Sequence, residues 1–492
     1  MKTKTTARHF LSVIALMLAI MMLFSACGNQ NAEVTSSDGT GDDSAVSDVS
    51  NDAQDETPSG DVSTVSTASI GSSTSSTTTP STGNGVWAKD IYGSMPAKVK
   101  SAGIHVLMWR AYTKTEKAMV DAFQKKTGVT VRTTVTTESE YPTKLVSLVS
   151  GKDSPDVVCF SSGNFPGLVT KSLQALDTQQ FRLNDSCWNK TYMDTYKING
   201  KYFGVAMPGI WSCEDCNYVT YYSPAVLKAC GVKDSEMPYT LYQSGKWDWS
   251  TQANIVRKVK AANKGYVALS LQSNDLFMLS AGVDFASYNG KQFTNNLGSV
   301  KNGSLLTQAW QQMATLRSEG CTAGWDLTNV QQGKVGLFTA IAYGLYNEGK
   351  WFDNVAGGAS QLQAVPVAGP TATSAYTPVR PKVWGVAKGA KNPEGAAYFL
   401  RYYLDTANCN MSSTFYNKQF ETVYNTITSS KAKKAVMVGW GVTDYVTSGA
   451  YSRICSDLTS ATPANVTTVL NSKQGTVQTS IARANKDLAR IK

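Results

Sequence analysis

The fold is decided by residues 104–160, which read IHVLMWRAYTKTEKAMVDAFQKKTGVTVRTTVTTESEYPTKLVSLVSGKDSPDVVCF. The stretch begins with Ile104–Trp109, an almost continuous apolar run that is typical of a strand buried on both faces. A helical pattern follows. Thr113 and Glu116 stand before it at the spacing of a capping box, and Gly128 supplies its stop.

Two more strands and a second helix complete the stretch. Val129–Val135 alternates as a strand, Leu145–Val149 forms the apolar face of a helix, and Asp156–Phe160 is a third buried strand. Strands that alternate with helices through short connections predict parallel pairing by right-handed crossovers. We therefore expect an α/β fold.

Polar and aromatic residues follow each of these strands. Because ligands bind outside the carboxyl ends of parallel strands, we expect these residues to share one rim. Ring faces, a guanidinium group, hydroxyls and an amide suit a polar molecule with apolar faces, and they form a poor set for catalysis. The binding residues predicted on this rim are Trp109, Arg110, Tyr112, Glu138, Ser161, Ser162 and Asn164.

The N-terminus has the pattern of a secretory signal. Three cations precede the apolar run Phe10–Phe24, which is too short for a spanning helix, and small residues lead to Cys27. The ending Leu23–Cys27 resembles the bacterial lipoprotein signal, which implies that residues 1–27 are a signal and that Cys27 is lipidated. The alternative is an ordinary cleavage site with an incidental cysteine.

Residues 28–100 are expected to form a disordered tether. The part up to about residue 86 is rich in Ser, Thr, Gly and Asp and holds nine acidic residues but no Lys or Arg. Such a composition cannot bury enough apolar surface to fold. The whole chain carries +10, the signal +3 and the tether −9, so the remainder carries +16. This charge favours a surface that faces anionic lipid or cell wall. An acidic ligand is the alternative, and nucleic acid is not expected.

About 400 residues remain after the tether, enough for two lobes. The one histidine after the signal, His105, lies inside the first strand, which excludes Ser-His-Asp and Cys-His sites. Cys213 and Cys216 form a single CxxC pair without further close ligands, so a local disulfide, free thiols or, least favoured, a metal are open. We expect no cofactor and no metal site.

Seven segments, in order along the chain, resemble the family 1 extracellular solute-binding proteins of bacterial ABC importers, the class of sugar receptors. They are Ala118–Val131, Tyr141–Val158, Leu168–Asp177, Asn199–Pro208, Tyr221–Gly231, Val365–Gly369 and Trp384–Leu404. The resemblance implies a two-lobed periplasmic-binding-protein fold of type II, in which each lobe is a mainly parallel sheet flanked by helices. Hinge crossovers join the lobes. The first lobe would hold residues 101–221 and 366–410, and the second 222–365 and 411–492.

The same resemblance implies a monomeric receptor without enzymatic activity on the outer face of the cell membrane, which delivers a carbohydrate to an ABC permease. Four more aromatic residues at strand ends or in the crossover strand are predicted to contact the ligand: Trp211, Tyr221, Tyr343 and Trp384. Three alternatives stay open. They are a secreted carbohydrate-active hydrolase, a sensor for a membrane kinase, and a receptor for ferric iron or another small solute, since Tyr221-Tyr222 resembles the paired tyrosines of ferric receptors.

Overall fold

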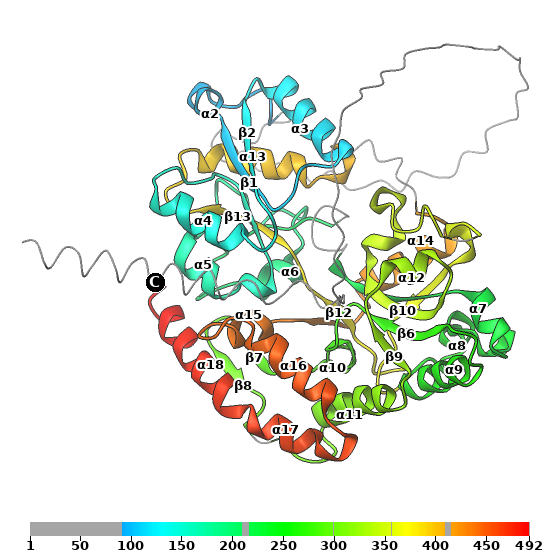
Figure 1. Ribbon diagram of the computed structural model, residues 1–492. Coiled ribbons are helices and arrows are strands. Elements are labelled where there is room, and N and C mark those ends of the chain that lie inside the picture. The colour runs from blue at the N-terminus through cyan, green and yellow to red at the C-terminus, as the bar shows by residue number, and fades with distance from the viewer. Residues whose placement is uncertain (1–90, 209–215, 299, 356, 409–414, 492) are drawn as a thin grey trace, which may run out of the picture.

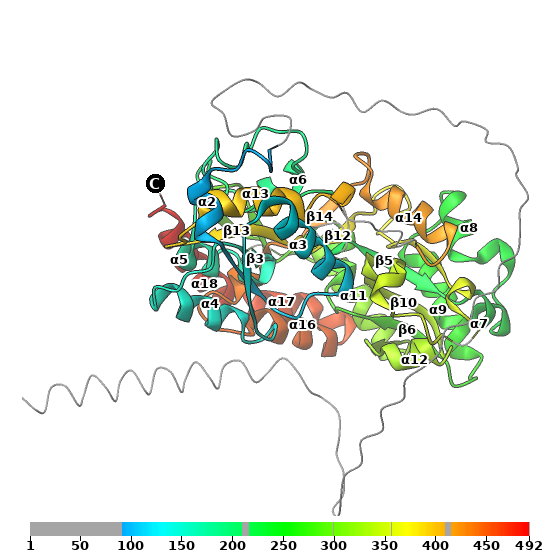
Figure 2. The same ribbon diagram turned by 90° about the horizontal axis from the view of Figure 1, so that it is seen from above.

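The structure, a computed structural model, describes residues 91–208, 216–298, 300–355, 357–408 and 415–491. Two α/β lobes stand side by side above a base of C-terminal helices (Figures 1 and 2). Among the helices described, none combines the length and the hydropathy that a membrane span requires.

The first lobe is built on the stretch that decides the fold. Its central strand, β1, pairs in parallel with β2 and, through a bridge from Val106 to Val157, with β3. All of β1 is buried, and Thr113 and Glu116 form the predicted capping box. The strands form two groups, β2-β1 and β3-β13-β4, with β13 antiparallel to both of its neighbours, and the Val106–Val157 bridge joins the groups. Its elements are α2 Ala97–Ala102, β1 Ile104–Met108, α3 Lys114–Thr127, β2 Val131–Val135, α4 Tyr141–Ser150, β3 Val158–Phe160, the 3-10 turn η2 Ser162–Asn164, α5 Gly167–Ser172, β4 Leu173–Gln174, α6 Lys190–Thr195, β13 Val383–Ala387 and α13 Pro393–Tyr403.

The second lobe holds a five-stranded sheet in the order β11-β5-β10-β6-β9. Strands β10, β6 and β9 run parallel, so their carboxyl ends meet at one edge. Strand β5 runs against β10 and β11. The elements are β5 Tyr218–Tyr222, α7 Pro224–Ala229, α8 Pro238–Gln243, α9 Trp249–Ala261, β6 Val267–Leu271, α11 Leu305–Ser318, β9 Thr322–Gly324, α12 Leu327–Gln331, β10 Val335–Ile341, the 3-10 turn η5 Ala342–Leu345, β11 Gln363–Pro366 and α14 Lys418–Thr428.

The base lies beneath both lobes and contacts each of them (Figure 1). Its helix α15 packs on η2 of the first lobe, and α16 packs on α11 of the second. The side chain of Asn199 in the first lobe donates to the carbonyls of Leu488 and Ile491, at 3.2 and 2.7 Å. The elements of the base are α10 Leu276–Ser280, β7 Ala286–Tyr288, β8 Phe293–Asn295, β12 Thr377–Val379, β14 Lys434–Val436, α15 Gly439–Thr443, α16 Ala450–Ser460, α17 Val466–Ser472 and α18 Gln474–Leu488.

The pairing of β5 places the end of the first segment of the first lobe earlier than expected. We expected the first lobe to run to residue 221, but β5 pairs within the sheet of the second lobe from Tyr218 onwards. The chain therefore first passes between the lobes before Tyr218. Strand β11 pairs on β5 over Gln363–Pro366, one residue past the expected end of this segment at 365, and the point of return to the first lobe stays a prediction.

Candidate functional site

A cavity of about 330 Å³ lies at the carboxyl ends of β6 and β9 in the second lobe. Residues 272–274 follow β6 and Trp325 follows β9, so strand ends form one wall. The opposite wall comes from Arg380 after β12 and from α15 and α16 of the base. This is where an α/β sheet is expected to hold a ligand. The lining residues are Leu271, Gln272, Ser273, Asn274, Gly324, Trp325, Arg380, Trp440, Tyr451, Ser452 and Cys455.

A buried ion pair forms the floor of this smaller cavity. The side chain of Asp275 is 0% exposed and that of Arg380 is 22% exposed. Asp275 accepts hydrogen bonds from Ser273 Oγ at 2.5 Å, from Tyr451 Oη at 2.7 Å and from Arg380 Nη2 at 3.3 Å. Burial raises the pKa of the Tyr451 hydroxyl well above its usual value, and Asp275 adds to this effect, so Tyr451 stays a neutral donor.

The ring of Trp440 connects this cavity to the first lobe. A Cβ atom on Gly163, in η2, would lie 3.3 Å from the ring, so the ring lies against the carboxyl end of β3. The Arg380 guanidinium lies 5.2 Å from the ring centroid, a cation–π contact. The indole Nε1 donates to Asp444 Oδ2 at 3.1 Å. Trp440 is half-buried.

The predicted rim of the first lobe is aromatic and basic. Trp109 is half-buried, and its ring lies 5.8 Å from that of Trp384. The Lys382 ammonium and the Arg110 guanidinium lie 5.1 and 5.7 Å from the Trp109 ring. Arg110 is also committed to Glu116, with contacts of 2.6 and 2.9 Å, so fewer of its donors are free for a ligand.

The other predicted rim residues differ in accessibility. Tyr112 is half-buried and its hydroxyl accepts from Thr133 at 3.3 Å, whereas Glu138 is exposed. The Ser161 amide donates to Asn164 Oδ1 at 3.1 Å. Ser162 is 0% exposed, so its side chain does not reach the rim surface.

Tyr343 of the second lobe is half-buried, and its ring centroid lies 6.0 Å from that of Trp351. It is within electrostatic range of the Arg110 guanidinium of the first lobe. Trp211, the remaining predicted aromatic, and Cys27 lie outside the described residues.

Tyr221 and Trp384 are core residues in this structure. Tyr221 is 0% exposed, stacks on Phe338 at 4.8 Å and donates its hydroxyl to the carbonyl of Ile341 at 2.8 Å. Trp384 is 2% exposed. Both lie on strands paired on both sides, and neither lines a wall of the smaller cavity. The hydroxyl of Tyr222 donates to Gln363 Oε1, so the two adjacent tyrosines serve separate acceptors and do not form a pair of metal ligands.

None of the eleven residues that line the smaller cavity was predicted from the sequence, and four of them carry the chemistry of its walls: Trp325, Arg380, Trp440 and Tyr451. Trp109 was predicted because it directly follows a strand. Trp325 also directly follows a strand, β9, but this short strand was not recognised in the sequence. Trp440 stands between two glycines, Gly439 and Gly441, which is a signal of close backbone packing. Arg380 and Tyr451 carry no comparable signal.

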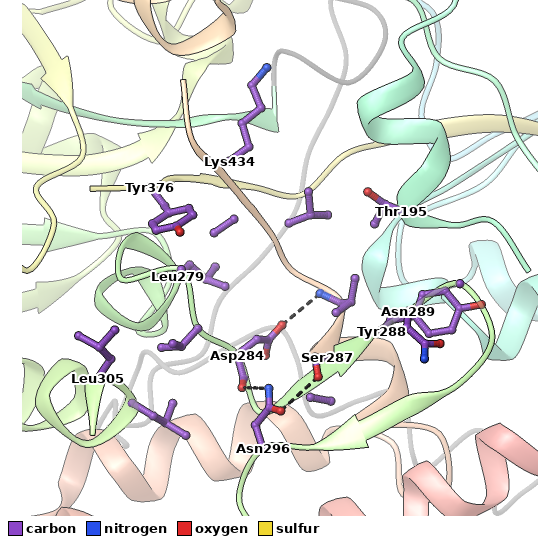
Figure 3. Close-up of a pocket in the computed structure, with 18 of the residues that line it drawn as sticks. Thr195, Leu279, Asp284, Ser287, Tyr288, Asn289, Asn296, Leu305, Tyr376 and Lys434 are labelled. Atoms are coloured by element: carbon purple, nitrogen blue, oxygen red, sulfur yellow. Dashed lines mark hydrogen bonds between the residues drawn. The ribbon is translucent and has the colours of Figure 1, made fainter. Parts of the chain in front are cut away.

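A second, larger cavity of about 760 Å³ lies between α6 of the first lobe and the base (Figure 3). Its walls come from α10, the hairpin β7–β8, the start of α11 and β14. Many of its walls are aliphatic, including Leu279, Val300 and Leu306. The carboxyl of Asp284 points toward the segment after β14.

Comparison with known proteins gives a family and a fold. The sequence model of the bacterial extracellular solute-binding proteins matches residues 110–408. Among proteins of curated function, none matches the chain.

Several solved structures share the fold. The galacto-N-biose/lacto-N-biose I-binding protein of Bifidobacterium longum has a TM-score of 0.57 at 15% identity, over 78% of this chain and 97% of that one. UgpB of Mycobacterium tuberculosis, bound to glycerophosphocholine, has 0.57 at 15% identity over 77% and 98%. The maltodextrin-binding MalE of Bdellovibrio bacteriovorus, bound to maltotriose, has 0.55 at 13% identity over 77% and 99%. At these identities the likeness establishes the two-lobed fold.

Proposed function

Because the chain belongs to the bacterial extracellular solute-binding proteins, we propose that it captures a carbohydrate between its lobes and delivers it to an ABC permease. The observation that carries the sugar assignment is the smaller cavity. Two half-buried tryptophans, Trp325 and Trp440, line it together with hydroxyls, two amides and an ion-paired guanidinium. Aromatic faces suit the C–H faces of a sugar ring, and the polar groups suit its hydroxyls.

The extent of the cavity favours an oligosaccharide that continues beyond it. Its 330 Å³ is near the lower end of the range for small-molecule sites, about 300–1,000 Å³. We propose that one end of the sugar occupies the cavity and that the rest lies along the rim formed by Trp109 and Tyr343. Arg110 and Glu138 remain our proposed hydroxyl partners on that rim, and Asn164 remains a proposed ligand contact.

A hydrolase is less well supported. Glycosidases use two carboxylates that flank the scissile bond. None of the described residues that line the smaller cavity is a carboxylate, and Asp275 beneath it is held in an ion pair.

Calorimetry on the secreted chain tests the proposal with four probes: lacto-N-biose, maltotriose, acarbose and glycerophosphocholine. We expect at least one of the three carbohydrates to bind with 1:1 stoichiometry. Binding should weaken in Trp325→Ala and stay unchanged in the control Tyr242→Ala, which removes a half-buried ring from α8, outside the cavity. Binding of glycerophosphocholine alone, or of none of the four, would overturn the carbohydrate assignment.

We also propose that Cys27 carries the lipid anchor and that the segment after it separates the folded part from the membrane. The tether was expected to extend over residues 28–100, but α2, Ala97–Ala102, begins within that range, so the proposed tether ends before it. The support is the signal pattern and the acidic, Ser/Thr-rich composition that follows it. In a bacterial host, wild type should sediment with membranes, and Cys27→Ser should appear in the soluble fraction. Equal sedimentation of the two would contradict the anchor.

A further inference from the structure

Helix α15 carries Trp440, and its backbone is in direct contact with the base on one side and with η2 of the first lobe on the other. A Cβ atom on Gly439 would collide with the carboxylate of Asp284, and one on Gly441 would collide with the carbonyl oxygens of Phe165 and Ser162. The two glycines therefore let α15 fit between the base and η2 of the first lobe. Trp440 lies between them, so its ring position depends on both contacts.

On the base side, the carboxylate of Asp284 contacts α15 by accepting hydrogen bonds from backbone amides. Its Oδ1 accepts from the Phe285 amide at 2.7 Å. Its Oδ2 accepts from the amides of Val438 and Gly439, at 3.1 and 2.7 Å. A carboxylate at these first amides of α15 also suits the helix dipole. The two hydrogen bonds from Val438 and Gly439 hold the turn that leads to Trp440, whose ring lines the smaller cavity.

The Asp284 carboxyl is 8% exposed and lies on the wall of the larger cavity, as Figure 3 shows. Burial raises its pKa from 3.8 to about 7, against the three amides, which lower it, and with a further increase from Asp275. The cavity gives protons a route to the group.

We propose that Asp284 is a positioning residue for Trp440, and that its protonation in mildly acidic conditions releases the first turn of α15 and weakens ligand binding. A neutral carboxyl still accepts hydrogen bonds, but more weakly than a carboxylate, and a proton on Oδ2 would face the amides of Val438 and Gly439. Protonation therefore weakens the two contacts that hold the first turn of α15. The effect on ligand rests on the proposed function, but the effect on Trp440 does not.

Other titratable groups surround Asp284, and the test must separate them. Asp275 precedes α10, Tyr451 and Cys455 lie on α16, and Asp444 lies on the segment after α15. Across the larger cavity are Tyr288, Lys434, Asp194 and Lys197. Burial raises the pKa of Tyr451, Cys455 and Tyr288 above their usual values, which keeps these groups neutral below pH 8. Burial also raises the pKa of Asp444, so a variant of Asp284 itself is needed.

The first test needs no ligand. The fluorescence of Trp440, taken as wild type minus Trp440→Phe, is followed from pH 5 to pH 8.5. We expect a transition with a midpoint near the pKa of about 7. Asp284→Asn should abolish it. Asp177→Asn should retain it, because that exposed carboxylate also accepts two backbone amides, at 2.8 Å each, but lies in the first lobe. A flat wild-type profile, or a transition that persists in Asp284→Asn, would overturn the proposal.

The second test uses maltotriose and lacto-N-biose. For a sugar that binds at pH 8, wild-type affinity should fall at least threefold at pH 5.5, and Asp284→Asn should be weak and nearly independent of pH. Equal pH dependence in both proteins would overturn the coupling to ligand. If neither sugar binds at pH 8, the sugar assignment for these probes fails, while the fluorescence test still decides the role of Asp284.

As pH falls, titration of Asp284 should raise the free energy of unfolding while it lowers ligand affinity. Acid unfolding is therefore excluded as the cause of the weaker binding. The folded pKa of Asp284 is about 7 and the unfolded value 3.8, so between these values the folded state binds the extra proton. The free energy of unfolding therefore gains a contribution as pH falls from about 7 toward 4. His105, whose pKa is lowered by burial, opposes this below pH 6.5. The difference in thermal midpoint between wild type and Asp284→Asn isolates the contribution of Asp284. It should grow in favour of wild type as pH falls from 7.5 to 5.5, and a constant difference would contradict titration of this group.

Discussion

The two cavities differ in size and in wall chemistry, and the smaller one is the better candidate for the ligand. The larger, of about 760 Å³, lies away from the carboxyl ends of β6 and β9, and its walls mix aliphatic residues with polar and charged ones but hold no tryptophan among the described residues. The smaller, of about 330 Å³, lies at the carboxyl ends of two parallel strands and combines two half-buried tryptophan rings with hydroxyls, amides and an ion-paired guanidinium. Volume alone would select the larger cavity. The position relative to the sheet and the chemistry of the walls select the smaller one.

The largest expected effect comes from breaking the floor of the smaller cavity. Arg380→Gln leaves the fully buried Asp275 without its cation, so we expect the free energy of unfolding to fall by about 3 kcal/mol. Lys117→Ala, which breaks an exposed pair with Asp121, should cost less than about 0.5 kcal/mol. Urea unfolding monitored by circular dichroism measures both. Equal losses would mean that the floor pair contributes no more than a surface pair.

The second effect tests whether the Trp440 ring, which connects the smaller cavity to the first lobe, contacts the ligand. Trp440→Ala should weaken binding of a carbohydrate probe by about 2 kcal/mol, or ~30-fold, because a buried stacking surface is lost. Calorimetry at pH 8 measures it, with Tyr242→Ala as the ring control. An affinity unchanged by Trp440→Ala would remove this cavity as the site.

The smallest effect is expected at the larger cavity. Leu305 is 44% exposed and lines that cavity. Leu305→Ser should change both the affinity for the probe and the free energy of unfolding by less than about 0.5 kcal/mol. A marked loss of affinity in the same calorimetric assay would reverse the ranking of the two cavities.

The sequence predicted the first lobe well because its signals are local. The buried run of β1, the capping box before α3 and the glycine after it all depend on near neighbours, and the structure confirms them. The two-lobed fold followed from segments that resemble a family, and the family match confirms that resemblance.

The site was harder to predict because it is assembled from distant segments. Asn274, Trp325, Arg380 and Tyr451 meet only in the folded chain, and no local pattern connects them. Tyr221 was assigned to the ligand from its place in the crossover strand. That place does not reveal that Phe338, Phe352 and Phe420 surround its ring.

The ion pair on the floor also has an electrostatic consequence. Arg380 is the one formally charged side chain among the described residues that line the smaller cavity, and Asp275 neutralises it. Because the pocket is neutral and the folded part is strongly cationic, salt should affect surface encounters and ligand binding differently. Encounters with anionic surfaces should weaken as ionic strength rises, whereas retention of an uncharged solute should be indifferent to added salt.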